Sequence, residues 1–170
     1  MTTTIRLARP SDLRHLAAIE DAGTPLFVEY FGDAVVAALV SPASSGADRD
    51  LSGTLYVAVV DSTLVGFAHV TSYDVHAHLE QVSVLPSHVR KGIGAALVRF
   101  AMDEARWTGF ELMSLCTYRD VPWNGPFYAG LGFREVTRLE TFQRRLREHE
   151  VALGLDGPGV RVVMQARLGR

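Results

Sequence analysis

The apolar residues of this chain follow two spacings, one typical of strands and one typical of helices. Short apolar or alternating runs predict strands at residues 3–8, 54–60, 64–73, 76–84, 112–117, 133–138 and 161–167. Apolar positions three and four residues apart predict a helix after Pro10-Ser11-Asp12 and further helices at residues 26–40, 92–106, 126–131 and 142–153. Residues 41–52 have no apolar period and are rich in Ser, Ala, Asp and Gly, so we expect a mobile surface loop there.

The order of these elements predicts a mixed α+β fold. A strand and helices come first, two strands with the pattern of a hairpin follow, and a strand–helix–strand unit lies at the centre of the chain. The central helix has an apolar stripe that predicts its buried face, made of Ile93, Leu97, Phe100, Ala101 and Ala105. Its polar residues Arg99, Asp103 and Arg106 are expected to face away.

Length and composition narrow the class of protein. The 170 residues predict one domain, residues 1–170, and 48% apolar with 21% charged residues are typical of a globular chain. The longest uninterrupted apolar run, residues 34–40, is too short to span a membrane, and the first residues lack the pattern of a signal peptide. A single cysteine, Cys116, suits a reducing cytoplasm and is expected to pack in the core. The net charge of −2 disfavours a nucleic-acid binder.

A glycine-containing loop, Arg90-Lys91-Gly92-Ile93-Gly94, joins a predicted strand to the central helix. Glycine lets a backbone approach a ligand closely, and the free N–H groups at a helix start favour a phosphate. Arg90 and Lys91, the only lysine, add positive charge there. A P-loop would need a Gly-Lys pair, which the chain lacks, and a dinucleotide fingerprint would need Gly or Ala where Leu97 stands. The loop therefore predicts a phosphate-binding site that is neither a P-loop nor a dinucleotide-binding turn.

The residues around this loop resemble the acyl-CoA-binding segment of the GNAT superfamily of N-acetyltransferases. The matching stretch is Leu-Glu-Gln-Val-Ser-Val-Leu-Pro at residues 79–86, followed by Arg-Lys-Gly-Ile-Gly-Ala-Ala-Leu at residues 90–97. Val89 occupies a position that is usually Arg or Gln in that family. A second block, residues 122–133, resembles the family's Asn-x-x-x-x-Tyr-x-x-x-Gly-Phe segment, and residues 5–13 resemble its opening strand and helix.

This resemblance implies a central mixed, mostly antiparallel sheet flanked by helices, acetyl-CoA as co-substrate and a primary amine as acceptor. With no covalent nucleophile in view, it also implies direct transfer in a ternary complex. No Gly-x-Ser-x-Gly motif supports a serine nucleophile. The match assigns acetyl-CoA binding to Val82, Val84, Val89, Arg90, Lys91, Gly92, Ile93, Gly94, Ala95, Asn124 and Tyr128.

Two residues are the candidates for proton transfer. Tyr128 matches the family tyrosine and is expected to act as the acid for the departing sulfur, and Glu80 as the base for the amine. Asn124 either binds CoA or caps the short helix. In an unbroken strand His76, His78 and Glu80 would share one face, which leaves open a solvated strand face or, less readily, a metal site.

The acceptor is the least constrained part of the prediction. Phe27, Glu29, Tyr30 and Trp123 would suit a small cationic amine, although Phe27 and Phe31 are expected to be core residues. We therefore expect a small-molecule N-acetyltransferase. The alternatives are a protein N-terminal or lysine acetyltransferase and an acyl-CoA-binding module without catalysis. The sequence leaves open whether the chain forms a homodimer.

Overall fold

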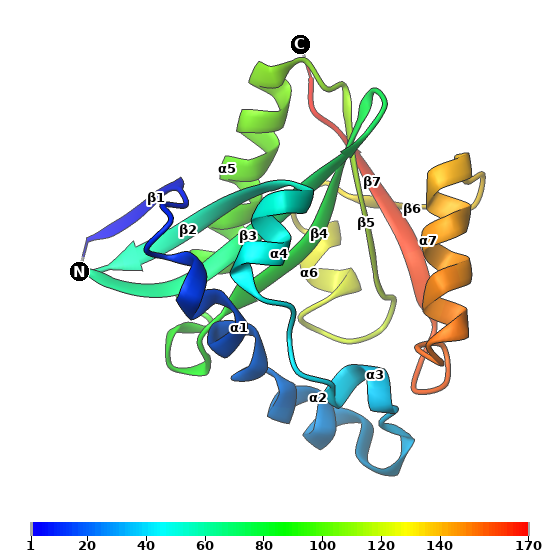
Figure 1. Ribbon diagram of the computed structural model, residues 1–170. Helices are drawn as coiled ribbons and strands as arrows, with labels where there is room; N and C mark the ends of the chain where they lie inside the picture. The colour runs from blue at the N-terminus through cyan, green and yellow to red at the C-terminus, as the bar shows by residue number, and fades with distance from the viewer. Residues whose placement is uncertain (1, 170) are drawn as a thin grey trace.

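A computed structural model describes residues 2–169, which form a seven-stranded sheet with helices on both faces (Figure 1). The strands are β1 (Thr3–Leu7), β2 (Thr54–Val60), β3 (Thr63–Tyr73), β4 (His76–Val84), β5 (Leu112–Tyr118), β6 (Arg134–Val136) and β7 (Arg161–Arg167). The helices are α1 (Leu13–Asp21), α2 (Thr24–Phe31), α3 (Ala37–Val40), α4 (Gly46–Ser52), α5 (Ile93–Thr108), α6 (Gly125–Ala129) and α7 (Thr141–Ala152), with short 3₁₀ helices η1 (Gly32–Ala34) and η2 (Pro86–His88). No helix within residues 2–169 is both long and apolar enough to cross a bilayer.

The strand order is β1-β2-β3-β4-β5-β7-β6, and every neighbouring pair is antiparallel except β4 and β5. The mixed, mostly antiparallel sheet is therefore confirmed. The hairpin between β2 and β3 is also confirmed, although it lacks an Asn-Gly or Asp-Gly pair. Asp61 and Ser62 adopt φ values of 44° and 69°, the left-handed conformation that suits a tight hairpin turn.

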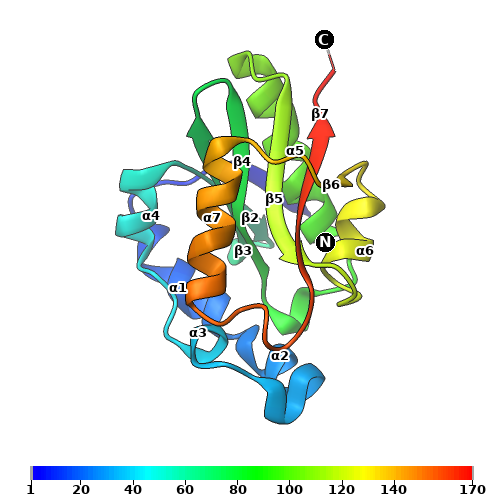
Figure 2. The ribbon, with the colours of Figure 1, turned by 90° about the vertical axis from the view of Figure 1, so that its right-hand side faces the viewer.

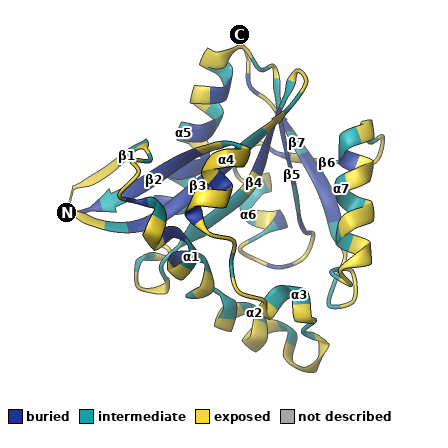
Figure 3. Cartoon of the chain, in the orientation of Figure 1, coloured by how far each residue is buried: buried dark blue, intermediate teal, exposed yellow. Residues whose placement is uncertain are grey.

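The two faces of the sheet carry different helices. Helices α5 and α6 lie on one face, and α1, α4 and α7 lie on the other (Figure 2). The larger buried cluster joins α5 to the sheet, and the predicted stripe is confirmed because Ile93, Leu97, Ala101 and Ala105 are buried in it. A smaller cluster packs Leu16 of α1 against β2 and β3. The buried central strands appear dark blue in Figure 3.

Strands β4 and β5 pair only at their beginnings. The parallel ladder joins residues 76–78 to residues 112–114 and ends at His78 and Ser114. Beyond that point β4 continues alongside β3 and β5 continues alongside β7, and Figure 1 shows them diverging. Backbone N–H and C=O groups on the facing edges beyond His78 are therefore left without a ladder partner across the divergence.

A β-bulge interrupts β4 at Glu80. His69 of β3 pairs with Gln81 and Val70 pairs with Leu79, so Glu80 is the extra residue. Leu79 before the bulge and Val82 after it both pack into the larger apolar cluster, although regular alternation would place them on opposite faces. Glu80 follows His78 on the face that carries α1, α4 and α7, and the bulge resets the alternation after it, so that Val82 returns to the face of Leu79.

Two predictions about residues 26–52 are wrong. The expected helix at residues 26–40 is divided into α2, η1 and α3, because Gly32 adopts φ 53° and ends α2. The expected loop at residues 41–52 contains helix α4. Ser45 caps that helix, since its Oγ accepts a hydrogen bond from the Asp48 N–H at 3.1 Å.

Candidate functional site

The loop between β4 and α5 has the geometry of an anion site. Arg90 and Gly92 adopt φ values of 61° and 79°, and the turn they make leads directly into α5 at Ile93. The first N–H groups of this 16-residue helix have no acceptor within the helix, and their partial positive charge favours a phosphate. Residues 89–95, all assigned to acetyl-CoA by the sequence, thus lie in one turn and the helix start that follows it.

Charge and shape at this loop fit a diphosphate-bearing ligand only in part. Val89 is exposed and contributes no side-chain donor at the position where the family usually has one. Lys91 is held near the loop, because its Nζ donates to the Ser87 carbonyl at 3.0 Å. Arg90 is exposed beside it. Backbone amides and two cations are therefore the groups that can hold phosphate here.

Helix α6 lies on the side of the sheet to which the sequence assigns acetyl-CoA, the expected acetyl donor, and we call this side the donor side. A Cβ placed on Gly94 would lie 3.6 Å from Phe127 Cζ and 3.8 Å from Val84 Cγ2, so α6 approaches both the start of α5 and the end of β4. Val82 and Val84 are half-buried on this same face. An extended acyl chain could lie along these residues and use the unpaired backbone edge of β4.

Tyr128 lies within α6 and packs against Phe127 and Phe133, at ring-centroid distances of 5.0 and 5.9 Å. Its hydroxyl has no hydrogen-bond partner among residues 2–169, and burial raises the pKa of Tyr128 to about 12. The phenol therefore keeps its proton near neutral pH and has it available to donate. Asn124 precedes the helix, but its side chain makes no capping hydrogen bond, which removes the capping alternative and leaves CoA binding as the prediction.

Glu80 lies on the opposite side of the sheet. Its side chain is 40% exposed, and its Oε2 lies 3.7 Å from Nε2 of His78. His78 is buried and forms a hydrogen bond of 2.9 Å between its Nδ1 and Ser114 Oγ. Burial lowers the pKa of His78 to about 4, so this neighbour is neutral at pH 7. Burial also raises the pKa of Glu80 above the usual range, against the opposing effect of Arg49.

The three alternating residues of β4 do share one face. The rings of His76 and His78 both lie against Phe142 of α7, at 5.6 and 6.2 Å, and His78 contacts Glu80. No group of three or more His, Cys, Asp or Glu side chains with metal-binding geometry occurs in the described part of the chain.

Further charged residues gather on this face, which we call the charged face. None of them belongs to a motif that the sequence shows. Arg49 of α4 binds Glu20 of α1 at 2.5 Å, and Glu150 of α7 binds both Arg147 and Arg161. They come from elements far apart in the sequence, and only the fold brings them together. The capping pattern Ser-x-x-Asp at residues 45–48 was the one local signal that could have identified α4.

The aromatic residues of α2 form a separate surface cluster. Phe27 and Phe31 lie outside both buried clusters and are half-buried, so the prediction that they are core residues is wrong. Phe31 packs on Tyr118 of β5 at 4.9 Å, and Tyr30 packs on Trp123 at 5.3 Å. Tyr30, Trp123 and Glu29 are exposed, as recognition of an acceptor would require.

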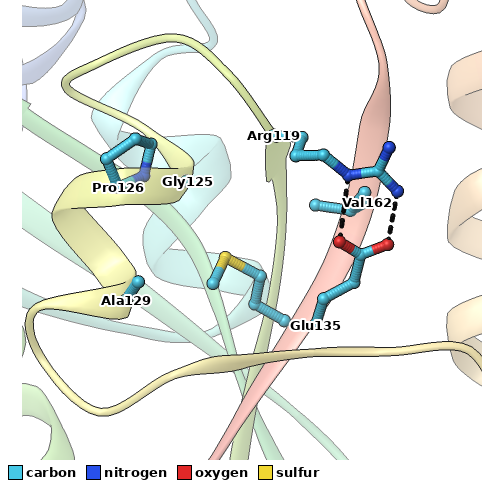
Figure 4. A pocket seen from close by; sticks show the side chains of 7 residues that line it. Arg119, Gly125, Pro126, Ala129, Glu135 and Val162 are labelled. Atoms are coloured by element: carbon cyan, nitrogen blue, oxygen red, sulfur yellow. Dashed lines mark hydrogen bonds and ion pairs between the residues drawn. The ribbon is translucent and has the colours of Figure 1, made fainter.

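A shallow depression lies elsewhere, between α6 and the β6–β7 edge (Figure 4). It has a volume of about 250 Å³ and a mostly apolar lining that includes Val162 and Met164. At its side Arg119 forms a two-point ion pair with Glu135, with an Nη2–Oε1 distance of 2.5 Å. Neither Glu80 nor Tyr128 lines it, so we do not place the reaction there.

Comparison with known proteins points to one family. The sequence model of the family described as "Acetyltransferase (GNAT) family" matches residues 15–133. The ribosomal-protein-S18-alanine N-acetyltransferase from Escherichia coli has a similar structure, with a TM-score of 0.70 and 20% identity over 99% of this chain and 96% of that one. PaiA N-acetyltransferase from Thermoplasma acidophilum, solved with coenzyme A, gives a TM-score of 0.69 and 18% identity over 98% and 99% of the two chains.

A third similar structure is N-acetylglutamate synthase from Neisseria gonorrhoeae, solved with coenzyme A and N-acetyl-glutamate. It gives a TM-score of 0.71 at 19% identity, and this chain spans only 36% of its length. At these identities the likeness concerns the fold. The named proteins act on different acceptors, so the comparison leaves the acceptor of this chain to be argued from its own residues.

Proposed function

Because this chain belongs to the GNAT family of acetyltransferases, we propose that it transfers the acetyl group of acetyl-CoA directly to the primary amine of a small molecule. Acetyl-CoA is the co-substrate, in line with the relatives that were solved with coenzyme A. It supplies an activated acyl group as a thioester. The loop before α5, the diverging edge of β4 and helix α6 are the parts of this chain that would hold it.

The observation that carries the proposal is the state of Glu80. The other acidic residues of the charged face described above are each paired with an arginine, Glu20 with Arg49 and Glu150 with Arg147 and Arg161. Glu80 has no arginine or lysine within ion-pair distance among residues 2–169, and His78 beside it is neutral at pH 7. Glu80 is therefore the carboxylate on this face that is free to accept a proton.

A base is needed because an amine attacks only in its neutral form. An ammonium group near Glu80 would give up its proton to the carboxylate, directly or through one water molecule. Because burial raises the pKa of Glu80, this carboxylate is a stronger base than an ordinary surface glutamate. The unpaired N–H groups on the edge of β4 beyond His78 are suitable donors for the acyl oxygen.

Tyr128 would act at the departing sulfur. Its pKa of about 12 lies well above the roughly 8.5 of a thiol, so complete proton transfer to the thiolate is unfavourable. Donation of a hydrogen bond to the developing negative charge costs no such transfer. We therefore assign Tyr128 the role of hydrogen-bond donor, with solvent supplying the final proton.

The choice of a small acceptor rests on contacts at the end of the charged face. A Cβ on Gly159 would lie 3.4 Å from Phe31 of α2, and one on Gly157 would lie 3.5 Å from Val36. The Tyr118 hydroxyl also donates to the Leu155 carbonyl at 2.7 Å. Residues 155–159 thus contact the segment that contains α2 and α3, which obstructs the path that an extended peptide would need. Exposed Tyr30 and Trp123 offer ring faces to a cation.

The test is a panel of acceptors at fixed acetyl-CoA, followed by the release of free thiol. Small primary amines, diamines and amino acids form one arm, and peptides with a free N-terminal alanine or an internal lysine form the other. A reaction without acceptor corrects for hydrolysis. Faster turnover of small amines supports the proposal, whereas turnover of peptides alone would replace it with protein acetylation. Binding of coenzyme A without turnover of either arm would favour the non-catalytic module.

A further inference from the structure

Arg49 is a buried cation on a helix that borders the charged face. Only 10% of its side chain is exposed, and its Nη2 donates to Glu20 Oε2 at 2.5 Å. The guanidinium lies over the ring of Phe67, 5.6 Å from the ring centroid, and its Nη1 lies 3.4 Å from Nδ1 of His69. Its Nε has no hydrogen-bond partner within the described chain. Removing a guanidinium from water is costly, so a purely structural role explains Arg49 poorly.

The chain around Arg49 fixes its position. Ser45 caps α4 at its start, and Ser52 Oγ donates to the Arg49 carbonyl at 3.1 Å. A Cβ on Gly46 would overlap the Leu13 carbonyl oxygen, so α4 lies directly against the start of α1. These contacts leave the backbone of Arg49 little freedom to move away from the sheet.

Arg49 and Glu80 lie on the same face, one strand apart. The neighbour of Arg49 on β3 is His69, and His69 pairs with Gln81, the residue that follows Glu80. Glu80 lies on this same face because it alternates with Leu79, which packs on the other side of the sheet. His69 cannot share the charge, because burial lowers its pKa to about 4. Arg49 is thus a cation held one strand away from the bulge.

Charged or titratable groups reach Glu80 from several elements. Arg49 comes from α4, Glu20 from α1, and His78 from β4 itself. His149 and Glu150 face it from α7, with Glu150 held by Arg147 and by Arg161 of β7. Among these, Arg49 acts most strongly on the ionisation of Glu80, and it favours the carboxylate.

We propose that Arg49 is a positioning residue for acetyl transfer: its buried guanidinium, fixed by α4 beside the bulge of β4, keeps Glu80 in the form that can accept a proton. This inference rests on the proposed role of Glu80 as the base. Glu20 weakens the effect of Arg49 on Glu80, because it neutralises part of the charge of Arg49. The helix that the sequence pattern did not predict would thereby control the chemistry of a residue on β4.

The direct test measures the titration of Glu80 in the free protein, by the side-chain carboxyl ¹³C shift, assigned through its loss in Glu80→Gln. Arg49→Met removes the charge but keeps an unbranched chain over Phe67. We expect the midpoint of Glu80 to rise by about one pH unit, because a nearby opposite charge favours the carboxylate by one unit or more. Arg49→Lys should restore most of the wild-type midpoint. Glu20→Gln should move it the opposite way, to lower pH.

The matched control is Arg119→Met, which removes an arginine that also holds one glutamate but lies by the depression beside α6. It should leave the midpoint of Glu80 unchanged. An unchanged midpoint in Arg49→Met, or an equal shift in Arg119→Met, would overturn the proposal. If Arg49→Met does not fold, Glu20→Gln decides, and the absence of a downward shift would overturn it.

The same variants are then compared in acetyl transfer with the best acceptor. The acidic limb of kcat/KM should follow the titration midpoint, with rates at high pH and affinity for coenzyme A unchanged. A shifted midpoint with an unshifted pH profile would show that Arg49 controls Glu80 but that Glu80 is not the base. That result would refute the proposed mechanism and the catalytic role of Arg49 while leaving the electrostatic link intact.

Discussion

The two sides of the sheet are built in different ways. The side that carries α5 and α6 takes its key groups from two continuous segments, one around the loop before α5 and one within α6. It is lined by apolar side chains and backbone amides. The charged face takes its groups from α1, α4, β4, α7 and β7, and arginine–carboxylate pairs dominate it.

This difference fits two separate roles, in which one side would bind the acetyl donor and the other would recognise the acceptor. A donor common to many enzymes can be held by backbone groups and apolar contacts, which tolerate changes of side chain. An acceptor particular to one enzyme needs side chains that differ between relatives, and these can come from any element that reaches the face. The following changes test whether the two sides are separable, from the largest expected effect to the smallest.

Gly94→Val should weaken the binding of coenzyme A and leave the charged face unchanged. The branched side chain would extend over the first amides of α5, next to Phe127. We expect coenzyme A to bind about 100-fold more weakly or worse, because two hydrogen bonds to a charged phosphate are worth about 3 kcal/mol together. Calorimetry measures the loss. Gly94→Ala is the control, since its Cβ meets only ordinary contacts at 3.6 Å and beyond. Equal loss in both variants would point to a folding defect.

Glu80→Gln should slow the transfer reaction and leave the binding of coenzyme A unchanged. We expect kcat/KM at neutral pH to fall by about 100-fold, a typical contribution of a general base. Because burial raises the pKa of Glu80, the wild-type rate should fall on acidification above the usual glutamate range. This acidic limb should disappear in Glu80→Gln, and the rates should converge at high pH, where the amine is already neutral. An unchanged profile would exclude Glu80 as the base.

Acid should destabilise the charged face in particular, because His69 and His78 are buried there as neutral rings. Their folded pKa values of about 4 lie below the 6.5 of an unfolded histidine. Their contribution to stability is complete above pH 6.5 and is lost as the pH falls toward 4. Between pH 7 and pH 5 each should cost about 2 kcal/mol, a factor of about 30 in the folding equilibrium. Urea unfolding at both values measures this. His78→Gln should unfold with a smaller pH dependence, and an equal dependence would contradict the assignment.

Tyr128→Phe should give the smallest change. It removes one hydroxyl and keeps the ring contacts with Phe127 and Phe133. Loss of one hydrogen bond to a charged sulfur is worth about 1.5 kcal/mol, or about tenfold in kcat. Affinity for coenzyme A should remain within a factor of about two. Single-turnover kinetics, which isolate the chemical step, measure the effect. A wild-type rate there would exclude Tyr128 from the reaction.

Local signals were sufficient to predict α5 and the turn that precedes it. The period of the apolar stripe identified α5, and the glycines with Arg90 and Lys91 identified the loop, since all these residues are close in sequence. The strand pattern also predicted which segments form the strands. Residues whose environment is set by their neighbours along the chain were therefore predictable.

The charged face was predictable only along β4, where alternation placed His76, His78 and Glu80 on one face and the family resemblance pointed to Glu80. Arg49, Glu150 and Arg161 could not be assigned to this face from the sequence, because only the fold brings their elements together. Helix α4 is stabilised by the cap at Ser45 and by the ion pair of Arg49, rather than by an apolar stripe, so periodicity could not identify it. Gly32 ended α2 within an apolar run that, by period alone, favoured one long helix.

The bulge at Glu80 marks a place where β4 can lose a residue and keep its pairing. Substitution at this position leaves Leu79 and Val82 on their own side of the sheet. Deletion of Glu80 would join Leu79 to Gln81, whose partners Val70 and His69 are already consecutive on β3, so the ladder would become regular and Val82 and Val84 would keep their side of the sheet. In a mutational library that covers both kinds of change, folded variants at position 80 should thus include the deletion as well as many substitutions.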